Sequence, residues 1–218
     1  MQRVPPREWN AISTDLRPVL LAKDTALFEP DQNGEYIYFP TDAVISFVGD
    51  TGDGGSLEVW SVGNEGVAGT FGVLGRTMPF RGVVQVQGTA LMAKTSTFRR
   101  HFQKRDAFHD AFLNYYHYLL RQVSYIGMCN NSHDILKRFS RWLLMVQDRA
   151  GTSELKFTQD AIAAALGTRR ATISVAAAAL QSAGLIRYTP GTITIKSRKA
   201  LLKAACRCYL EIGKSKSD

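Results

Sequence analysis

The sequence has few cysteines and no long apolar run. Its 218 residues include three cysteines, an odd number that gives no disulfide framework and fits a reducing compartment. The longest stretch without a charged residue, 171–186, contains threonine, serine, glutamine and glycine, so it cannot supply the roughly 20 apolar residues of a membrane span. Its first ten residues, MQRVPPREWN, lack the apolar segment of a secretory signal. We therefore expect a cytoplasmic protein.

Several catalytic and metal-binding patterns are also missing. Residues 1–100 contain no histidine, which argues against a cupin-type metalloenzyme with histidines on its strands. No cysteine precedes Cys129, which argues against an iron–sulfur cluster, commonly held by four cysteines. The glycine-rich stretch 69–77 has Thr70 and Arg76 where a phosphate loop needs glycine and lysine, and no Gly-x-Ser-x-Gly elbow occurs. We predict no catalytic residues and no metal site.

Positive charge gathers in the last part of the chain. Up to Ser132 there are 12 Lys and Arg against 13 Asp and Glu, whereas residues 133–218 have 15 against 6. The overall net charge of +8 therefore arises entirely from the C-terminal segment. A compact basic segment attracts polyanions, of which nucleic acid is the usual one. A solvated basic surface that only aids solubility remains the alternative.

The first hundred residues have the pattern of a small β barrel or sandwich. The segments rich in β-branched and aromatic residues are Tyr36–Phe39, Ala43–Val48, Leu57–Val62 and Val83–Gln87. Turn-forming clusters separate them. Glycines recur at every third position from Gly63 to Gly75, around Glu65, and such a stretch can turn tightly or approach a ligand closely.

A helical period then replaces the strand pattern. Five apolar residues with 4-3-4-3 spacing predict a helix over about 106–131: Phe112, Tyr116, Leu119, Val123 and Ile126. Only Asp110 and Arg121 are charged between Ala107 and Asn131, so we predict that these five residues form a dimer interface. A helix buried within one subunit is the alternative. A second helix starting near Ser132 has Leu136 at the beginning of its expected core face.

The segment 157–195 has the pattern of a helix-turn-helix followed by two strands. Thr158 and Thr168 are predicted to cap two short helices that are joined through Gly167. Their expected inner faces are Ile162 and Leu166 in the first helix, and Ile173, Ala177 and Leu180 in the second. Arg169 and Arg170 stand on the first turn of the second helix, which is the turn that enters a major groove in this motif. The alternative is a pair of hairpins used only for packing.

Residues 157–163, 166–174 and 183–186 resemble the winged helix of the Crp/Fnr family of bacterial transcription regulators. The resemblance extends over nearly the whole chain and implies an α+β fold. It predicts an N-terminal, cupin-like β-roll of the cyclic-nucleotide-binding type as sensor (1–104), a dimerisation helix (105–132) and a winged helix-turn-helix (133–218). The implied function is binding of a pseudo-palindromic operator by a homodimer, with RNA polymerase as a further partner.

The resemblance also assigns roles in DNA binding. Arg170 matches the guanine-reading arginine, and Thr158 and Thr168 match caps on the phosphate side. The remaining predicted DNA-binding residues are Gln159, Arg169, Thr172 and Ser174. The sequence departs from the best-known members at Ala171 and Val175, which stand where a glutamate and a basic residue are usual. These departures leave the operator sequence undetermined.

The candidate effector residues are Glu65, Thr70 and Arg81. Members that bind cyclic AMP have a glutamate where this chain has Thr70, and serine or threonine where Gly82 follows Arg81, so we expect no intact cyclic AMP site. Haem is unsupported, because every histidine lies at or beyond the start of the long helix: His101, His109, His117 and His133. The sequence thus leaves the effector unidentified. A constitutive or architectural DNA-binding protein with a vestigial sensor is the alternative function.

Overall fold

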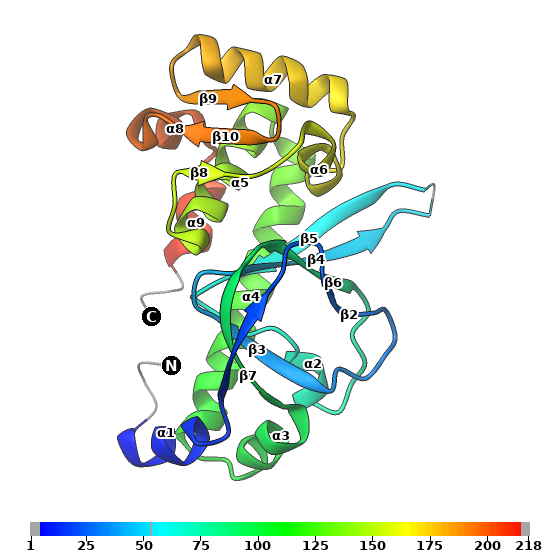
Figure 1. Ribbon diagram of the computed structural model, residues 1–218, viewed down its shortest axis with the longest axis vertical. Helices are drawn as coiled ribbons and strands as arrows, with labels where there is room; N and C mark the ends of the chain where they lie inside the picture. The colour runs from blue at the N-terminus through cyan, green and yellow to red at the C-terminus, as the bar shows by residue number, and fades with distance from the viewer. Residues whose placement is uncertain (1–4, 53, 215–218) are drawn as a thin grey trace. The chain divides into compact units, whose positions relative to one another are not determined.

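The computed structural model describes residues 5–52 and 54–214 and divides into two compact units (Figure 1). The N-terminal unit consists of the chain up to Phe47 together with Ser61–Arg121. The C-terminal unit consists of Val48–Trp60 and the chain from Gln122 onwards. Each unit has its own buried apolar residues.

Two sheets form the β-roll. The strands are β1 (Arg17–Leu21), β2 (Ala26–Phe28), β3 (Tyr36–Pro40), β4 (Val44–Asp50), β5 (Ser56–Val62), β6 (Arg81–Val86) and β7 (Gly88–Lys94). One sheet has the order β1-β7-β3 and the other has the order β2-β6-β4-β5. Ile37, Ile45 and Phe47 are almost fully buried, which explains why β-branched and aromatic residues mark these strands in the sequence. The predicted strands are confirmed.

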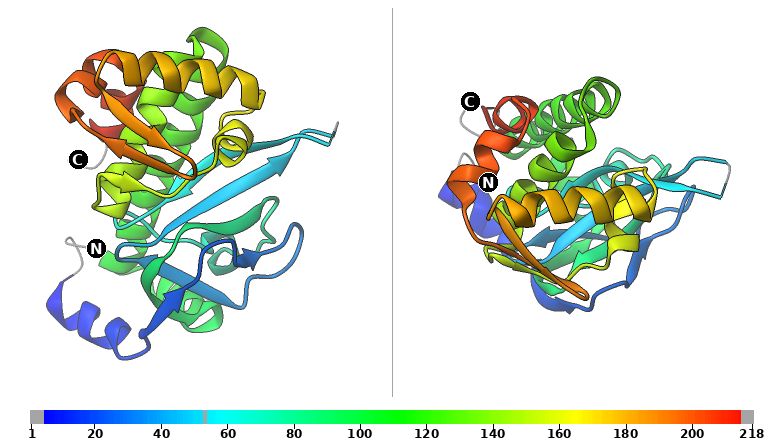
Figure 2. Two further views of the ribbon diagram at one scale, coloured as in Figure 1. Left: turned by 45° about the horizontal axis from the view of Figure 1, so that its top comes forward. Right: turned by 90° about the horizontal axis from the view of Figure 1, so that it is seen from above.

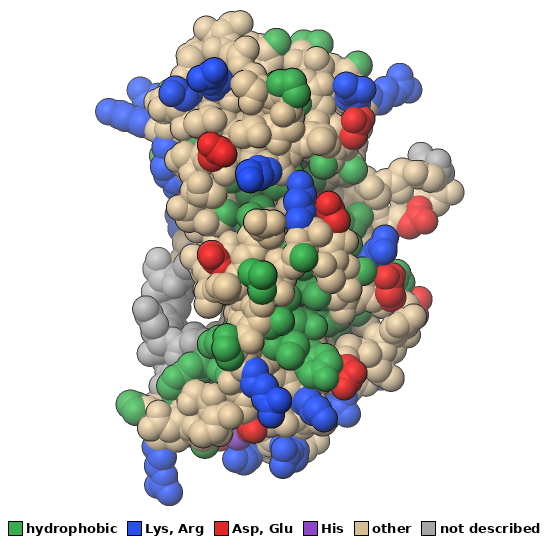
Figure 3. All heavy atoms as spheres, viewed as in Figure 1, with side chains coloured by type: hydrophobic (Ala, Val, Ile, Leu, Met, Phe, Trp, Pro, Cys, Tyr) green, Lys and Arg blue, Asp and Glu red, His purple; other side chains and the backbone are tan. Residues whose placement is uncertain are grey.

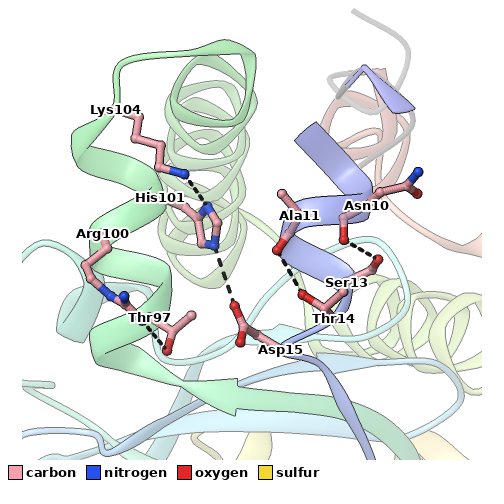
Figure 4. A network of polar contacts seen from close by, with 9 residues as sticks. All are labelled: Asn10, Ala11, Ser13, Thr14, Asp15, Thr97, Arg100, His101 and Lys104. Atoms are coloured by element: carbon pink, nitrogen blue, oxygen red, sulfur yellow. Dashed lines mark hydrogen bonds and ion pairs between the residues drawn. The ribbon is translucent and has the colours of Figure 1, made fainter. Parts of the chain in front are cut away.

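Helices close the N-terminal unit. They are α1 (Pro6–Ser13), α2 (Thr70–Val73), α3 (Thr95–Gln103) and the first half of α4 (Ala107–Ser132). Ile12, Phe98, Phe108 and Phe112 pack together in one apolar cluster. A polar network covers one side of it, where His101 Nε2 lies 3.7 Å from Asp15 Oδ2 and its Nδ1 lies 3.5 Å from Lys104 Nζ (Figure 4). The network links α3 to the end of α1.

The C-terminal unit continues with helices around a small sheet. Its elements after α4 are α5 (Ile135–Ala150), β8 (Glu154–Leu155), α6 (Gln159–Ala165), α7 (Arg170–Ser182), β9 (Ile186–Thr189), β10 (Thr192–Ile195), α8 (Arg198–Ala204) and α9 (Cys208–Lys214). The sheet has the order β8-β10-β9. Asp134 caps α5 by accepting a hydrogen bond from Lys137 N at 3.0 Å, and Gly151 ends the helix with a φ of 65°. The α+β fold class is confirmed.

Three local predictions need correction. The second helix starts at Ile135 and not near Ser132, because Asp134 supplies the cap, and Leu136 is 37% exposed instead of lying in the core. Arg169, rather than Thr168, occupies the N-cap position of α7, and its side chain makes no capping hydrogen bond.

Within the described ranges 5–52 and 54–214, no helix combines the length and the apolar character needed to cross a bilayer.

Candidate nucleic-acid interface

The first helix of the motif is fixed by its cap. Thr158 is in extended conformation, and its Oγ1 accepts a hydrogen bond from Ala161 N at 3.2 Å. This satisfies one of the backbone N–H groups that a helix start leaves without a partner. Ile162 and Leu166 are buried as predicted, whereas Thr158 itself is exposed. Gln159, the first residue of α6, is half-buried.

The turn between α6 and α7 depends on a glycine. Gly167 has a φ of 57°, a left-handed conformation that favours glycine over other residues. A Cβ at this position would lie 2.8 Å from Leu57 Cδ1, so the position also leaves little space for a side chain. The turn is held by two hydrogen bonds to the main chain: Thr168 N donates to Ala163 O at 2.9 Å, and Arg138 Nη2 donates to Leu166 O.

The first turn of α7 carries the exposed positive charges. Arg169 and Arg170 are both exposed at the helix start, and Ser174 is exposed one turn later. Thr172 is half-buried. Arg170 Nε lies 3.7 Å from Asp160 Oδ2 on α6, but both side chains are more than two-thirds exposed. Such a surface ion pair contributes only about 0–1 kcal/mol, so Arg170 can leave it for another partner at little cost.

The two faces of α7 differ sharply. Its inner face, formed by Ile173, Ala177 and Leu180, is buried as the sequence predicts. Its outer face has small or apolar residues beyond the arginines: Ala171 is exposed, and Val175 is 72% exposed. Val175 lies on the exposed face of α7 one turn beyond Ala171.

The wing is the three-stranded sheet of β8, β10 and β9, which is hydrogen-bonded to α7. The strands β9 and β10 pair from Thr192 opposite Thr189, around a turn in which Gly191 has a φ of 77°. Figure 2 shows these strands beside α7, to which they are joined because Tyr188 N donates to Gln181 Oε1 at 2.6 Å. The sequence prediction missed β8, which pairs with β10, because two residues are too few to give a strand pattern.

Basic side chains are exposed on the C-terminal unit (Figure 3). In the space-filling view of Figure 3, Lys and Arg side chains stand out at the upper end, over the C-terminal unit. This agrees with the excess of 15 basic over 6 acidic residues in 133–218. A positive surface around an exposed helix start can neutralise several phosphates of a duplex.

The candidate effector residues have different surroundings. Thr70 begins α2 and is 3% exposed, with its side chain beside that of Tyr116 on α4. Arg81 Nε lies 3.3 Å from Glu29 Oε1, and the arginine side chain is 56% exposed. Glu65 is half-buried. Thr70 and Arg81 therefore interact with different residues, Tyr116 and Glu29, and do not contact a shared partner.

Glycines in the β-roll make room for an aromatic ring. A Cβ on Gly69 or Gly82 would lie 3.0 or 2.5 Å from the ring of Phe28. That ring is buried, and its centroid lies 5.7 Å from that of Phe47 and 5.8 Å from that of Tyr38. The close approach that the sequence suggested for a ligand is thus made here by Phe28. A hollow of about 270 Å³ opens beside it, lined in part by Glu29 and Tyr36.

Comparison with protein families matches residues 137–204 to the Crp-like helix-turn-helix domain. The chain carries a Crp-like helix-turn-helix domain. No curated protein matches it in sequence. This domain is the evidence for DNA binding, and it covers the cap, the turn and the recognition helix described above.

Solved structures show the fold of the remainder. FixK2 from Bradyrhizobium japonicum has a TM-score of 0.74 at 16% identity, over 88% of this chain and 98% of that one. A protein from Eubacterium rectale that is assigned to the Crp/Fnr family has a TM-score of 0.72 at 16% identity, over 93% and 95%. The c-di-GMP-responsive regulator CLP from Xanthomonas campestris has 0.67 at 14%, over 88% and 100%. A Crp-like helix-turn-helix domain in a chain with this fold identifies a DNA-binding transcription regulator.

Proposed function

We propose that this regulator binds a pseudo-palindromic DNA operator as a homodimer. The observation that carries the proposal is the exposed start of α7, where Arg169 and Arg170 project from a turn fixed by Gly167. An arginine at this position can form a bidentate pair with guanine O6 and N7, which gives roughly 1–3 kcal/mol of discrimination. Thr158 and Thr168 lie on the turns before the two helices, where they suit contacts to phosphate.

The dimer places two such helices on one duplex. Half-sites about 34 Å apart correspond to one turn of DNA, so the operator repeats the two-fold symmetry of the protein. The remaining predicted contacts, from Gln159, Thr172 and Ser174, then flank the arginines on the same helices. We further propose a cytoplasmic protein that acts through DNA and RNA polymerase rather than by catalysis. Residues 1–104, 105–132 and 133–218 serve as sensor, dimerisation helix and DNA-binding domain.

The dimer contact on α4 is assigned to its exposed apolar residues. Leu113, Leu120 and Met128 are 46%, 67% and 50% exposed. The five residues predicted from the sequence to form the interface are instead buried or half-buried within the single chain. Phe112, Leu119 and Ile126 are at most 7% exposed, and Tyr116 and Val123 are half-buried. We therefore propose that Leu113, Leu120 and Met128 contact a second copy of the chain, while the five predicted residues pack α4 against its own chain.

A constitutive regulator is the second candidate. It is favoured by Phe28, whose ring fills the space beside Gly69 and Gly82, and by Arg81, which is paired with Glu29. An effector would have to displace or adapt to these contacts. A ligand shifts the equilibrium between two conformations of a protein only as far as its affinities for them differ. A regulator that binds no effector therefore keeps a fixed DNA-binding activity.

Selection of genomic DNA fragments by the purified full chain tests both candidates. The assay uses wild type, Arg170→Ala and the charge-matched Arg100→Ala, without added ligand and at one stated salt concentration. We expect wild type and Arg100→Ala to enrich the same palindrome, and Arg170→Ala to lose the enrichment while it still binds DNA non-specifically. Enrichment of a palindrome by all three proteins would contradict the role of Arg170. No binding by any of them would contradict the proposed function.

A further inference from the structure

Four side chains with metal-binding atoms meet in the C-terminal unit. The Sγ atoms of Cys129, Cys206 and Cys208 and a ring nitrogen of His133 all lie within 4.8 Å of one another. Cys129 is in the last turn of α4, and His133 follows that helix directly. Cys206 lies in the link between α8 and α9, and Cys208 begins α9. Residues distant in sequence therefore converge on one point.

The local backbone conformation explains why the side chains of Cys129 and His133, and those of Cys206 and Cys208, point towards the same place. Cys129 and His133 are four residues apart, the spacing that places two side chains on one face of a helix, and His133 N still donates to Cys129 O at 3.1 Å. Two residues that are two positions apart on a helix would point to different faces. Only Cys208 is helical, and the non-helical link before it turns Cys206 towards the same point.

The distances suit a tetrahedral ion. Cys129 Sγ lies 3.3 Å from Cys206 Sγ, and Cys208 Sγ lies 3.8 Å from His133 Nδ1. Zinc with sulfur ligands at about 2.3 Å and nitrogen at about 2.0 Å has ligand-to-ligand separations of about 3.5–3.8 Å. The three cysteines are at most 6% exposed, and His133 is half-buried. Four protein ligands in a closed setting are typical of a structural site rather than a catalytic one.

A buried arginine supplies an independent argument. Arg141 is 3% exposed, its Nε has no hydrogen-bond partner, and its Nη1 meets the weak acceptor Met145 Sδ at 3.2 Å. Among the residues that the structure describes, no carboxylate pairs with it. A buried charge without a counter-charge is costly. Arg141 acts electrostatically on all three thiols, so an anion at the thiol cluster would compensate it.

We propose that Cys129, His133, Cys206 and Cys208 form a structural zinc site. Binding of Zn²⁺ replaces the protons of the three thiols, which leave to solvent, and neutral His133 supplies the fourth ligand. The resulting centre has two positive and three negative charges, a net charge of −1 that matches the positive charge of Arg141. The ion ties the end of α4 to the beginning of α9 within the C-terminal unit.

Metal analysis of the full-length protein is the first test. The protein is purified without metal affinity steps, and its zinc, iron and sulfide contents are measured per chain. We expect one zinc per chain. After removal of the zinc by a strong chelator, added Co²⁺ should produce the d–d bands of tetrahedral cobalt and a sulfur-to-cobalt charge-transfer band.

The cysteine content gives a second readout on the unmodified chain. All three cysteines of the sequence lie in the proposed site, so a thiol reagent reports on the site alone. We expect the thiols to react slowly in the zinc-loaded protein and rapidly after chelation. This comparison needs no substitution and therefore does not depend on whether a variant folds.

Variants then locate the ligands. We expect Cys206→Ser with Cys208→Ser to abolish zinc binding and His133→Ala to weaken it at least tenfold, whereas His117→Ala, an exposed histidine of α4, leaves it unchanged. Three outcomes would overturn the proposal: a wild-type chain that neither contains nor takes up zinc, iron with sulfide in its place, or a Cys129–Cys206 disulfide in protein prepared under reducing conditions. Loss of DNA binding is not among these readouts, so the zinc site and the proposed function fail separately.

Discussion

The guanidinium of Arg138 on α5 donates a hydrogen bond to the main-chain oxygen of Leu166, at the end of α6. Burial lowers the pKa of Arg138, but the group stays charged at neutral pH. The bond satisfies a carbonyl group that the helix end leaves without an intrahelical partner. It thereby fixes the turn that precedes Arg170, so α5 takes part in positioning the recognition helix.

Replacing Arg138 by methionine keeps most of the side-chain length and removes the donor. We expect a loss of about 1.5–3 kcal/mol in the free energy of unfolding, because a charged hydrogen bond is lost and a carbonyl group is left unpaired. Urea denaturation measures the loss. Lys137→Met, which removes an exposed lysine paired with Asp134, is the control and should change stability by less than about 1 kcal/mol. Equal effects of the two substitutions would contradict the role of the Leu166 contact.

Asp160→Asn tests whether the ion pair with Asp160 competes with DNA for Arg170. We expect stability to change by less than about 1 kcal/mol, because the pair is exposed. Binding to the operator should be equal or tighter, since Arg170 loses a competing anion and the interface gains one unit of positive charge. Titration of labelled operator at several salt concentrations checks this. Weaker binding at all of them would show that Asp160 orients Arg170 for readout.

Leu120→Glu tests the dimer contact. With 67% of Leu120 exposed in the single chain, the substitution should leave the fold intact and place like charges opposite each other in the dimer. We expect sedimentation equilibrium to show at least tenfold weaker dimerisation. Leu74→Glu, at an apolar position with 41% exposure just after α2, is the matched control and should dimerise like wild type. An unchanged dimer in Leu120→Glu would place the interface elsewhere.

Tyr116 gives the protein a pH dependence at the alkaline end. Burial raises the pKa of its hydroxyl to about 12 from the ordinary value of 10, although Thr70 beside it partly offsets the effect. The folded protein therefore holds this proton more tightly than the unfolded chain does. The contribution is complete below pH 10 and is lost as the pH rises to about 12, and it amounts to on the order of 2 kcal/mol. Tyr116→Phe should unfold with a visibly shallower dependence on pH in this window, as followed by circular dichroism; an unchanged slope would exclude Tyr116 as its source.

The strands and the helix-turn-helix could be predicted because their signals are local. The β-branched and aromatic runs in 36–62, the cap at Thr158 and the buried residues Ile173 and Leu180 depend on neighbours within a few positions, and the structure has them where the sequence indicates. The N-cap of α7 was misplaced by one residue, from Thr168 to Arg169, because a hydroxyl next to a glycine looks like a cap whether or not it bonds.

Features that join distant parts of the chain were not predictable in the same way. Periodicity shows that α4 has an apolar stripe, but it does not show which neighbour covers the stripe, and Phe112 packs inside the chain with Phe98. The thiol cluster was not predictable for the same reason, since Cys129 and Cys206 are 77 positions apart in the sequence. The signal was present as His133 four residues after Cys129 and as the Cys-x-Cys at 206–208.

The outer face of α7 has a consequence for the kind of base it can read. Ala171 and Val175, four residues apart on the exposed face of α7, present methyl groups, where a hydrogen-bonding side chain would recognise polar base edges. Methyl groups instead contact the C5-methyl of thymine in the major groove. An operator synthesised with uracil in place of thymine keeps every Watson–Crick hydrogen bond and loses only these methyls. We therefore expect weaker binding to the uracil operator wherever Ala171 or Val175 lies against a thymine.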